Sequence, residues 1–149
     1  MVDEDFIKKL IKDQENVNRE FKLKITSKQK IAKTISAFAN TLGGIIIVGV
    51  ADNGKMIGID ADEEKFMIQS ANEEFCTPQA NITFEDFTFW TDFGNQSEEN
   101  EINLLLAFVS RTEDQKVFTS ENGIKKAYTR KNDQTLVDSD SQNGENKLE

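Results

Sequence analysis

The 149-residue sequence contains no histidine, one cysteine (Cys76) and one proline (Pro78). The missing histidines exclude a His-based acid–base site. With a single thiol they also exclude a Cys–His nucleophile and a zinc cluster of Cys and His ligands. One cysteine cannot form an internal disulfide, and such sparing use of cysteine fits a reducing compartment.

Long hydrophobic runs are also missing. No stretch approaches the ~20 apolar residues of a membrane helix. The first five residues, Met1-Val2-Asp3-Glu4-Asp5, are acidic where a signal peptide would be basic. We expect no membrane association and a cytoplasmic location.

The net charge of −9 argues against indiscriminate binding to a polyanion. The charge is unevenly distributed, however. Residues 19–33 carry +5 and residues 102–131 carry +3, whereas residues 53–101 hold two lysines against twelve acidic residues. The two basic segments are either ordinary solvated faces of a strand and a helix or the places where an anion binds.

Hydrophobic periodicity predicts alternating helices and strands in the first half of the chain. Asp3 can cap a first helix, and Phe21 begins an apolar–lysine alternation over 21–25 that predicts a half-buried strand with outward lysines. A second helix is expected from Thr26 or Ser27 to about residue 42, ended by glycine, and a buried strand over 45–50. Asn53-Gly54 predicts a hairpin into a short strand at 56–59.

The second half has the same mixed character. Asp62 is expected to open a third helix with an inward face of five residues: Phe66, Met67, Ser70, Ala71 and Phe75. Strands are expected at 82–89 and 102–109, followed by a hairpin around Asn122-Gly123. The predicted fold class is α+β, with helices packed on a mixed β-sheet in a single domain over residues 1–137. Residues 138–149 have almost no apolar content, and we expect a disordered tail.

One region resembles the Schlafen AlbA-like domain family, which was once labelled a divergent AAA domain. The resemblance is carried by Glu15 five residues before Glu20-Phe21-Lys22, and by four further segments: Ile35-Ser36-Ala37-Phe38-Ala39-Asn40-Thr41 with Gly43-Gly44, Gly49-Val50-Ala51-Asp52, Asn53-Gly54-Lys55 and Ile57-Gly58. Fainter matches occur at Pro78 and at Tyr128-Thr129-Arg130. The resemblance is close over residues 15–60 and loose over 60–131.

The resemblance implies a nucleic-acid-binding module, for DNA or RNA, of the kind regarded in bacteria as a transcriptional regulator. Some eukaryotic relatives cleave RNA with a carboxylate triad, whose positions match Glu15, Glu20 and Asp52 here. Those carboxylates would hold Mg²⁺ or Mn²⁺ if the chain were a nuclease. Asn16 and Ala51 stand where the family usually has Ser and an acid, so one carboxylate is missing. If the resemblance is set aside, the residues alone favour an ion pair for Glu20. They favour a turn-forming role for Asp52 and a solvated side chain for Glu15.

For nucleic-acid binding, the expected phosphate contacts form two groups. The first group comprises Lys22, Lys24, Lys28, Lys30 and Lys33, and the second comprises Lys125, Lys126, Arg130 and Lys131. Such contacts fix position but read no sequence. A third function class, a protein-interaction module working through its acidic surface, remains open beside the regulator and the ribonuclease.

Four residues of the resembling region are expected to serve the structure: Asn40, Gly43, Gly44 and Gly49. Asn40 should bond the Gly43-Gly44 turn or a neighbouring strand. The glycine pair is no phosphate loop, because the helix precedes it and no Gly-Lys-Ser/Thr follows, so we expect no ATP binding.

A homodimer is the expected assembly, because Alba-type proteins are generally dimers and this chain holds one such lobe. The aromatic residues of strand 82–90 could serve as a base-stacking platform, but core packing or a subunit interface is favoured.

Overall fold

The computed structural model describes residues 3–91, 94 and 98–138. Three α-helices are present in this part of the chain: α1 (Glu4–Lys12), α2 (Lys28–Ala39) and α3 (Ala61–Phe75). A 3₁₀ turn, η1, spans Glu98–Asn100. Each α-helix begins at a polar cap whose side chain accepts a backbone N–H: Asp3 for α1, Ser27 for α2 and Asp60 for α3. The fold is α+β, as the sequence predicted.

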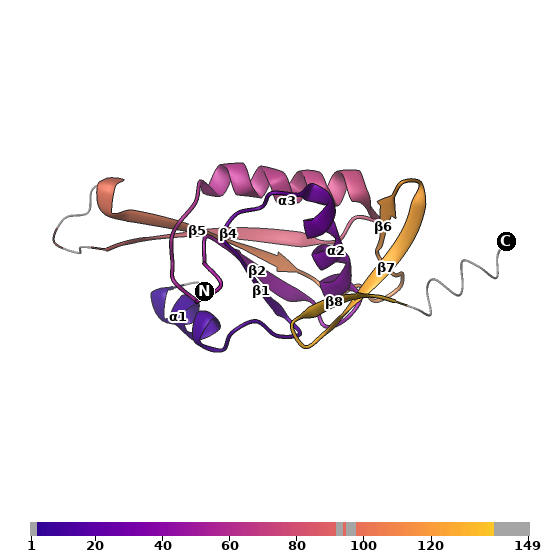
Figure 1. The fold of residues 1–149 in the computed structure, drawn as a ribbon, viewed down its shortest axis with the longest axis horizontal. Helices are drawn as coiled ribbons and strands as arrows, with labels where there is room; N and C mark the ends of the chain where they lie inside the picture. Colours follow the sequence, from indigo (N-terminus) through magenta and orange to yellow (C-terminus); the bar gives the residue numbers. More distant parts are fainter. Residues whose placement is uncertain (1–2, 92–93, 95–97, 139–149) are drawn as a thin grey trace.

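The first sheet has the strand order β1-β2-β5-β4 and is mixed. Its strands are β1 (Arg19–Lys22), β2 (Gly44–Val48), β4 (Ile82–Trp90) and β5 (Glu101–Val109). β1 runs parallel to β2, whereas the β2–β5 and β4–β5 pairs are antiparallel. β4 and β5 form a long hairpin that projects beyond the helices (Figure 1).

Helices cover both faces of this sheet. On one face, α2 and α3 pack on Ile46, Val48 and Leu105 in the larger core cluster. On the other face, Ile7 and Leu10 of α1 pack on Ile47 and Leu106 in a second cluster. Successive strand residues point to opposite faces, and this alternation explains why the apolar run of β2 serves two separate cores.

The second sheet has the order β3-β6-β7-β8 and lies against α2. Its strands are β3 (Cys76–Thr77), β6 (Phe118–Glu121), β7 (Ile124–Lys131) and β8 (Gln134–Val137). Figure 1 shows α2 between this sheet and the first one. The helix therefore holds the two sheets together, and its buried face is unusually wide.

Several details differ from the sequence prediction. The strand predicted at 21–25 ends at Lys22, because the amides of Gly49 and Val50 both donate to the Lys22 carbonyl and β2 ends beside it. No strand forms over 56–59, where only Met56 bridges to Val50. Phe66 points outward on α3 and is 62% exposed, since the inward face centres on Ile68.

The tail prediction falls mostly outside the described residues, which end at 138. Asp138 itself is held by the protein: its amide donates to the Ala127 carbonyl, and its carboxylate meets Lys116 at 2.7 Å. Within the described ranges, no helix is long and apolar enough to cross a membrane.

Candidate nucleic-acid interface

The first lysine group gathers around the N-terminus of α2. The chain from β1 to this helix is anchored at Ile25, which is buried and whose amide donates to Oε2 of the buried Glu64 on α3 at 3.3 Å. Ser27 then caps the helix by accepting from the Lys30 amide at 3.2 Å. The anchored loop and the capped helix thus fix the backbone that carries Lys24 and Lys30.

A cavity of about 200 Å³ lies between this loop and the helix. We call it the lysine pocket; it is lined by Lys22, Lys24, Ile25, Thr26, Ser27, Lys30 and Ile31. Of the described residues, three cations and no carboxylate line it, and the helix N-terminus adds a partial positive charge. Lys24 and Lys30 are exposed and form no ion pair with any described residue. The lysine pocket is therefore suited to an anion such as a phosphate group.

The other lysines of the first group are engaged with acidic partners. Lys22 lies 3.9 Å from Glu20, and Lys28 lies 3.2 Å from Glu74 while sitting over the Phe66 ring. Lys33 lies 3.1 Å from Glu121. These partly exposed pairs are weak, so Lys22 and Lys28 can exchange a carboxylate for a phosphate at little cost.

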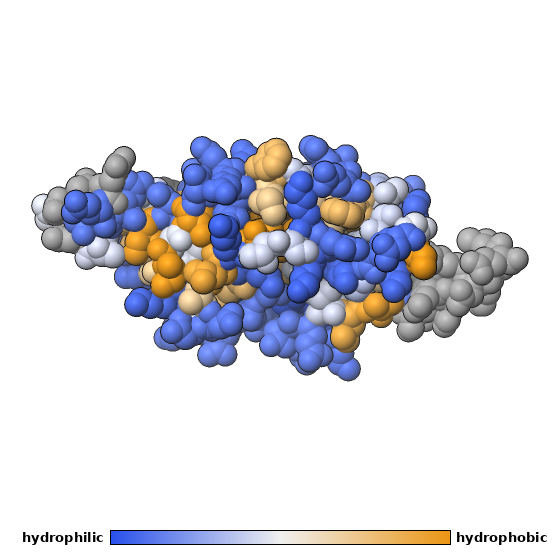
Figure 2. All heavy atoms as spheres, turned by 45° about the horizontal axis from the view of Figure 1, so that its top comes forward, coloured by the Kyte–Doolittle hydropathy of each residue, from blue (hydrophilic) through white to orange (hydrophobic). Residues whose placement is uncertain are grey.

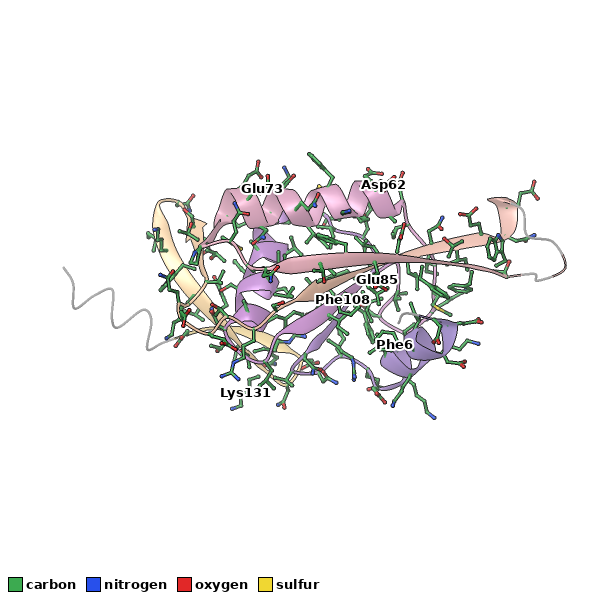
Figure 3. The ribbon with its side chains drawn as sticks, turned by 180° about the vertical axis from the view of Figure 1, so that it is seen from behind. Phe6, Asp62, Glu73, Glu85, Phe108 and Lys131 are labelled. Atoms are coloured by element: carbon green, nitrogen blue, oxygen red, sulfur yellow. The ribbon has the colours of Figure 1, made fainter. Side chains whose placement is uncertain are left out.

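The predicted second group does not form one surface. β7 alternates its side chains, so Lys126 and Arg130 share the face toward α2, whereas Lys125 and Lys131 share the other. Lys125 and Lys131 are exposed (Lys131 is labelled in Figure 3). Lys126 lies 3.7 Å from the same Glu121 that holds Lys33. The single basic patch expected on this strand is thus divided between two faces.

Arg130 corrects the sequence prediction more sharply. Its side chain is only 1% exposed and lies over the Phe38 ring, 5.0 Å from the centroid. The guanidinium donates to the Asn16 carbonyl, the Arg19 carbonyl and the Glu20 carboxylate, the last at 2.7 Å. In this position Arg130 joins β7 to β1 and is unavailable to a phosphate. We therefore withdraw it as a direct nucleic-acid contact.

The carboxylates of Glu15 and Glu20 lie together beside Arg130. Burial and a hydrogen bond with Glu15 raise the pKa of Glu20 to about 7, although Arg130 and Lys22 act in the opposite direction. Burial alone would raise the pKa of Glu15, but hydrogen bonds from the Glu20 carboxyl and the Phe21 amide, together with Arg130, hold it below its usual value. Below about pH 7 the pair therefore shares one proton, with the negative charge mainly on Glu15.

Asp52 lies in an exposed turn after β2. It shares with Glu15 a cavity of about 520 Å³, the acidic pocket, which is lined by Ile11, Lys12, Gln14, Glu15, Phe21, Asp52, Asn53, Gly54 and Asp133. Among the residues that the structure describes, no three Asp or Glu side chains come together so that they could hold a metal ion. The carboxyl group of Glu20 is also hydrogen-bonded to Glu15 and to Arg130. The residues Glu15, Glu20 and Asp52 thus do not fit the Mg²⁺ or Mn²⁺ site of a nuclease.

Asn40 occupies the centre of the contact between α2 and the second sheet. Its amide nitrogen donates to the carbonyls of Val117 and Tyr128, and its oxygen accepts from the Val117 amide at 2.8 Å. Ser36 reinforces this contact by donating to the Val117 carbonyl at 2.7 Å. Asn40 therefore bonds neighbouring strands, one of the two arrangements expected for it.

The three motif glycines, Gly43, Gly44 and Gly49, allow close packing. Gly43 and Gly49 have positive φ angles of 74° and 109°. A Cβ on Gly44 would meet the Phe38 ring at 2.6 Å.

Two acidic residues that shape the interface were missed from the sequence. Glu64 anchors the loop through the Ile25 amide, and Glu121 holds Lys33, Lys126 and the Tyr128 hydroxyl. Glu64 stands among three acids in the first turn of α3, and no sequence signal marks the one that turns inward. Glu121 directly precedes the Asn122-Gly123 turn, where an acid is unremarkable.

Comparison with known proteins gives one family. A model of the family described as Schlafen, AlbA_2 matches residues 15–137. No curated protein matches the chain. Among solved structures, the crystal structure of the DIP2311 protein from Corynebacterium diphtheriae is similar, with a TM-score of 0.48 and 17% sequence identity. That match covers 82% of this chain and 22% of the other, so this chain spans about a fifth of the length of that protein.

Proposed function

This chain belongs to the Schlafen AlbA_2 family, and from that premise we propose that it binds nucleic acid through the lysine pocket. The observation that carries the proposal is local: three lysines line one cavity with no carboxylate, in a protein whose net charge is −9. Phosphate is the anion that a row of such cations at a helix N-terminus suits. Lys28 extends the row along α2.

Binding through these lysines should be weak and strongly salt-dependent. Each neutralised phosphate contributes about −0.9 to the slope of log K against log salt on duplex DNA and about −0.7 on single strands. Four contacts, by Lys22, Lys24, Lys28 and Lys30, predict a slope of about −3.6 on duplex DNA and about −2.8 on single strands. Transcriptional regulation would further require selective contacts to base edges, which lysine–phosphate contacts do not supply.

The test is a fluorescence-anisotropy titration with duplex DNA, single-stranded DNA and tRNA at several salt concentrations. Lys24→Glu/Lys30→Glu should abolish binding without changing the circular dichroism spectrum. Lys8→Glu/Lys55→Glu alters the net charge equally at exposed sites away from the pocket and should retain binding. If the two double variants bind equally well, the lysine pocket is not the interface.

The ribonuclease alternative receives no such support, because its three carboxylates do not fit a metal site. Because the lysine pocket needs no metal ion, the affinity for nucleic acid should be the same in EDTA as in Mg²⁺. The protein-interaction alternative would be favoured if neither DNA nor RNA bound at low salt.

We also propose that two chains associate through β4, the outer strand of the first sheet. Strand edges carry unpaired N–H and C=O groups, and the aromatic side chains of β4 are only partly buried. A two-fold dimer would place two lysine pockets in one particle and double the number of phosphate contacts.

A further inference from the structure

A second cationic cavity lies at the end of the first sheet where β1 and β2 begin and β5 ends. Its volume is about 410 Å³, within the range of roughly 300–1,000 Å³ that is usual for small-molecule sites. We call it the arginine pocket; it is lined by Asn18, Arg19, Leu42, Gly43, Gly44, Ile45, Phe108, Val109, Ser110 and Arg111. None of these residues belongs to the lysine pocket.

Among the residues that the structure describes, the charged ones lining this cavity are Arg19 and Arg111. Arg19 makes one long contact, 3.4 Å from Nη1 to Asp13, and its Nε is buried with no hydrogen-bond partner in the described part of the protein. Arg111 is exposed and forms no ion pair with a described residue. Two guanidinium groups with unused donors favour an anion with several oxygens, since arginine binds phosphate and carboxylate in a two-pronged geometry.

The backbone carrying both arginines is fixed. On either side of Arg111, the Ser110 amide donates to the Asn81 carbonyl at 2.9 Å and the Thr112 amide donates to the Ala39 carbonyl at 2.8 Å. Arg19 is paired with Ile45 in the sheet, and its carbonyl accepts from Arg130. The bond from Thr112 also occupies a carbonyl at the C-terminus of α2, which would otherwise repel an anion.

The rest of the wall is apolar. Ile45 and Phe108 lie on the same face of the sheet as α1, beyond the part that α1 covers, and both are half-buried. Phe108 is labelled in Figure 3. Leu42 is 58% exposed beside them. The face of the molecule drawn in Figure 2 is largely hydrophilic and carries several hydrophobic patches. The arginine pocket combines a hydrophobic wall with two arginines. It suits a ligand that joins an anion to a flat apolar group.

We propose that the arginine pocket binds a nucleotide unit, with its phosphate on Arg19 and Arg111 and its base against Leu42 and Phe108. The unit is either a free nucleotide or the phosphorylated end of a single-stranded nucleic acid. Binding of a strand end rests on the proposed function. The phosphate is held by side chains at a sheet end, so the absence of a phosphate loop after Gly43-Gly44 does not exclude it.

The experiment is an NMR titration of the ¹⁵N-labelled chain with adenosine 5′-monophosphate, inorganic phosphate, and single-stranded oligonucleotides with and without a 5′-phosphate. The amides of Gly43 and Arg111 should shift saturably with the nucleotide, and more weakly with inorganic phosphate. Arg111→Gln should weaken nucleotide binding about tenfold or more, as expected for losing a hydrogen bond to a charged group. Lys9→Gln, an exposed change outside the cavity, should leave it unchanged.

Three outcomes overturn the inference: no saturable shift at those amides, equal affinity of the parent and Arg111→Gln, or equal affinity for nucleotide and inorganic phosphate. The Lys24→Glu/Lys30→Glu variant separates it from the proposed function. If that variant no longer binds the strand but binds the nucleotide as the parent does, the proposed function and the nucleotide site are both supported. If the parent binds the nucleotide but no strand, only the inference stands, with the free nucleotide as its ligand. A preference for the 5′-phosphorylated strand identifies the strand end as a ligand.

Discussion

At the scale of single residues, the most consequential side chain is Arg130. The sequence places it in a run of cations and predicts a surface contact. The structure buries it against Phe38 and joins it to three segments of the chain. Period-two alternation could have indicated that Lys125 and Arg130 point to opposite sides of a strand, but it could not say which side faces α2. That depends on tertiary packing.

Arg130→Ala should lower the free energy of unfolding by about 3–5 kcal/mol, because it leaves the Asn16 and Arg19 carbonyls and the charged Glu15–Glu20 pair without their shared donor. Lys131→Ala changes the neighbouring exposed cation and should stay within about 0.5 kcal/mol of the parent. Urea denaturation of the three proteins measures both values. Similar losses for the two variants would show that the Arg130 contacts contribute little.

The shared proton of Glu15 and Glu20 predicts a pH dependence of stability. The pKa of Glu20 is raised from 4.5 to about 7 in the folded protein, so its contribution is fully present below pH 4.5 and is lost as the pH rises through 7. Glu15→Gln replaces the negatively charged acceptor of this hydrogen bond by a neutral amide, and the pKa of Glu20 should fall. Between pH 5 and 7 the parent should therefore lose about 1–2 kcal/mol more than Glu15→Gln. Parallel curves from urea denaturation at each pH would contradict the shared proton.

At the scale of elements, the sequence predicted best where periodicity is strong and local. The second helix and strands β4 and β5 appear close to their expected bounds, because each has a long, consistent apolar pattern. β8 was missed: Gln134–Val137 is mostly exposed and is placed by pairing with β7, which no local pattern encodes. Likewise the lysines of the loop could be found from composition. The burial of Arg130, and the cavity that Asp52 shares with Glu15 but not with Glu20, required the fold.

The packing of β2 on α2 gives a sharp test at this scale. Gly44→Ala would place a methyl group 2.6–2.8 Å from three atoms of the fully buried Phe38 ring. We expect a loss of about 1–3 kcal/mol in the free energy of unfolding, from overpacking. Gly44→Ala/Phe38→Leu should be more stable than the sum of the single changes predicts, because the smaller side chain makes room. Simple additivity in thermal or urea unfolding would mean that the two sites do not interact.

At the scale of the whole molecule, the acidic charge of residues 53–101 contrasts with the positive charge of the lysine and arginine pockets. Asp62 and Glu73 lie on the side of α3 that faces away from the sheet (Figure 3), and Glu85 and Asp86 occupy the middle of β4. Charges on an outer strand oppose edge-to-edge association. They therefore limit the dimer that we propose, since antiparallel pairing centred on β4 brings Asp86 close to its copy.

Glu85→Gln/Asp86→Asn should accordingly strengthen self-association, by about 1 kcal/mol, through removal of like-charge repulsion. Sedimentation velocity over a range of micromolar concentrations distinguishes the mass of one chain from that of two. Raising the salt concentration should shift the parent in the same direction and the variant much less. If both proteins remain monomers throughout, β4 is not a dimer interface.

The second core cluster has a practical consequence for anyone dividing this protein into parts. The family match begins at residue 15, but Ile7 and Leu10 of α1 pack on Phe21, Ile47, Val50, Leu104 and Leu106 on one face of the sheet. A protein trimmed to the matched residues would expose that face to water, and solvent-exposed apolar surface of this kind promotes aggregation. The boundary of sequence similarity therefore differs from the boundary of the folding unit, which starts at least one helix earlier.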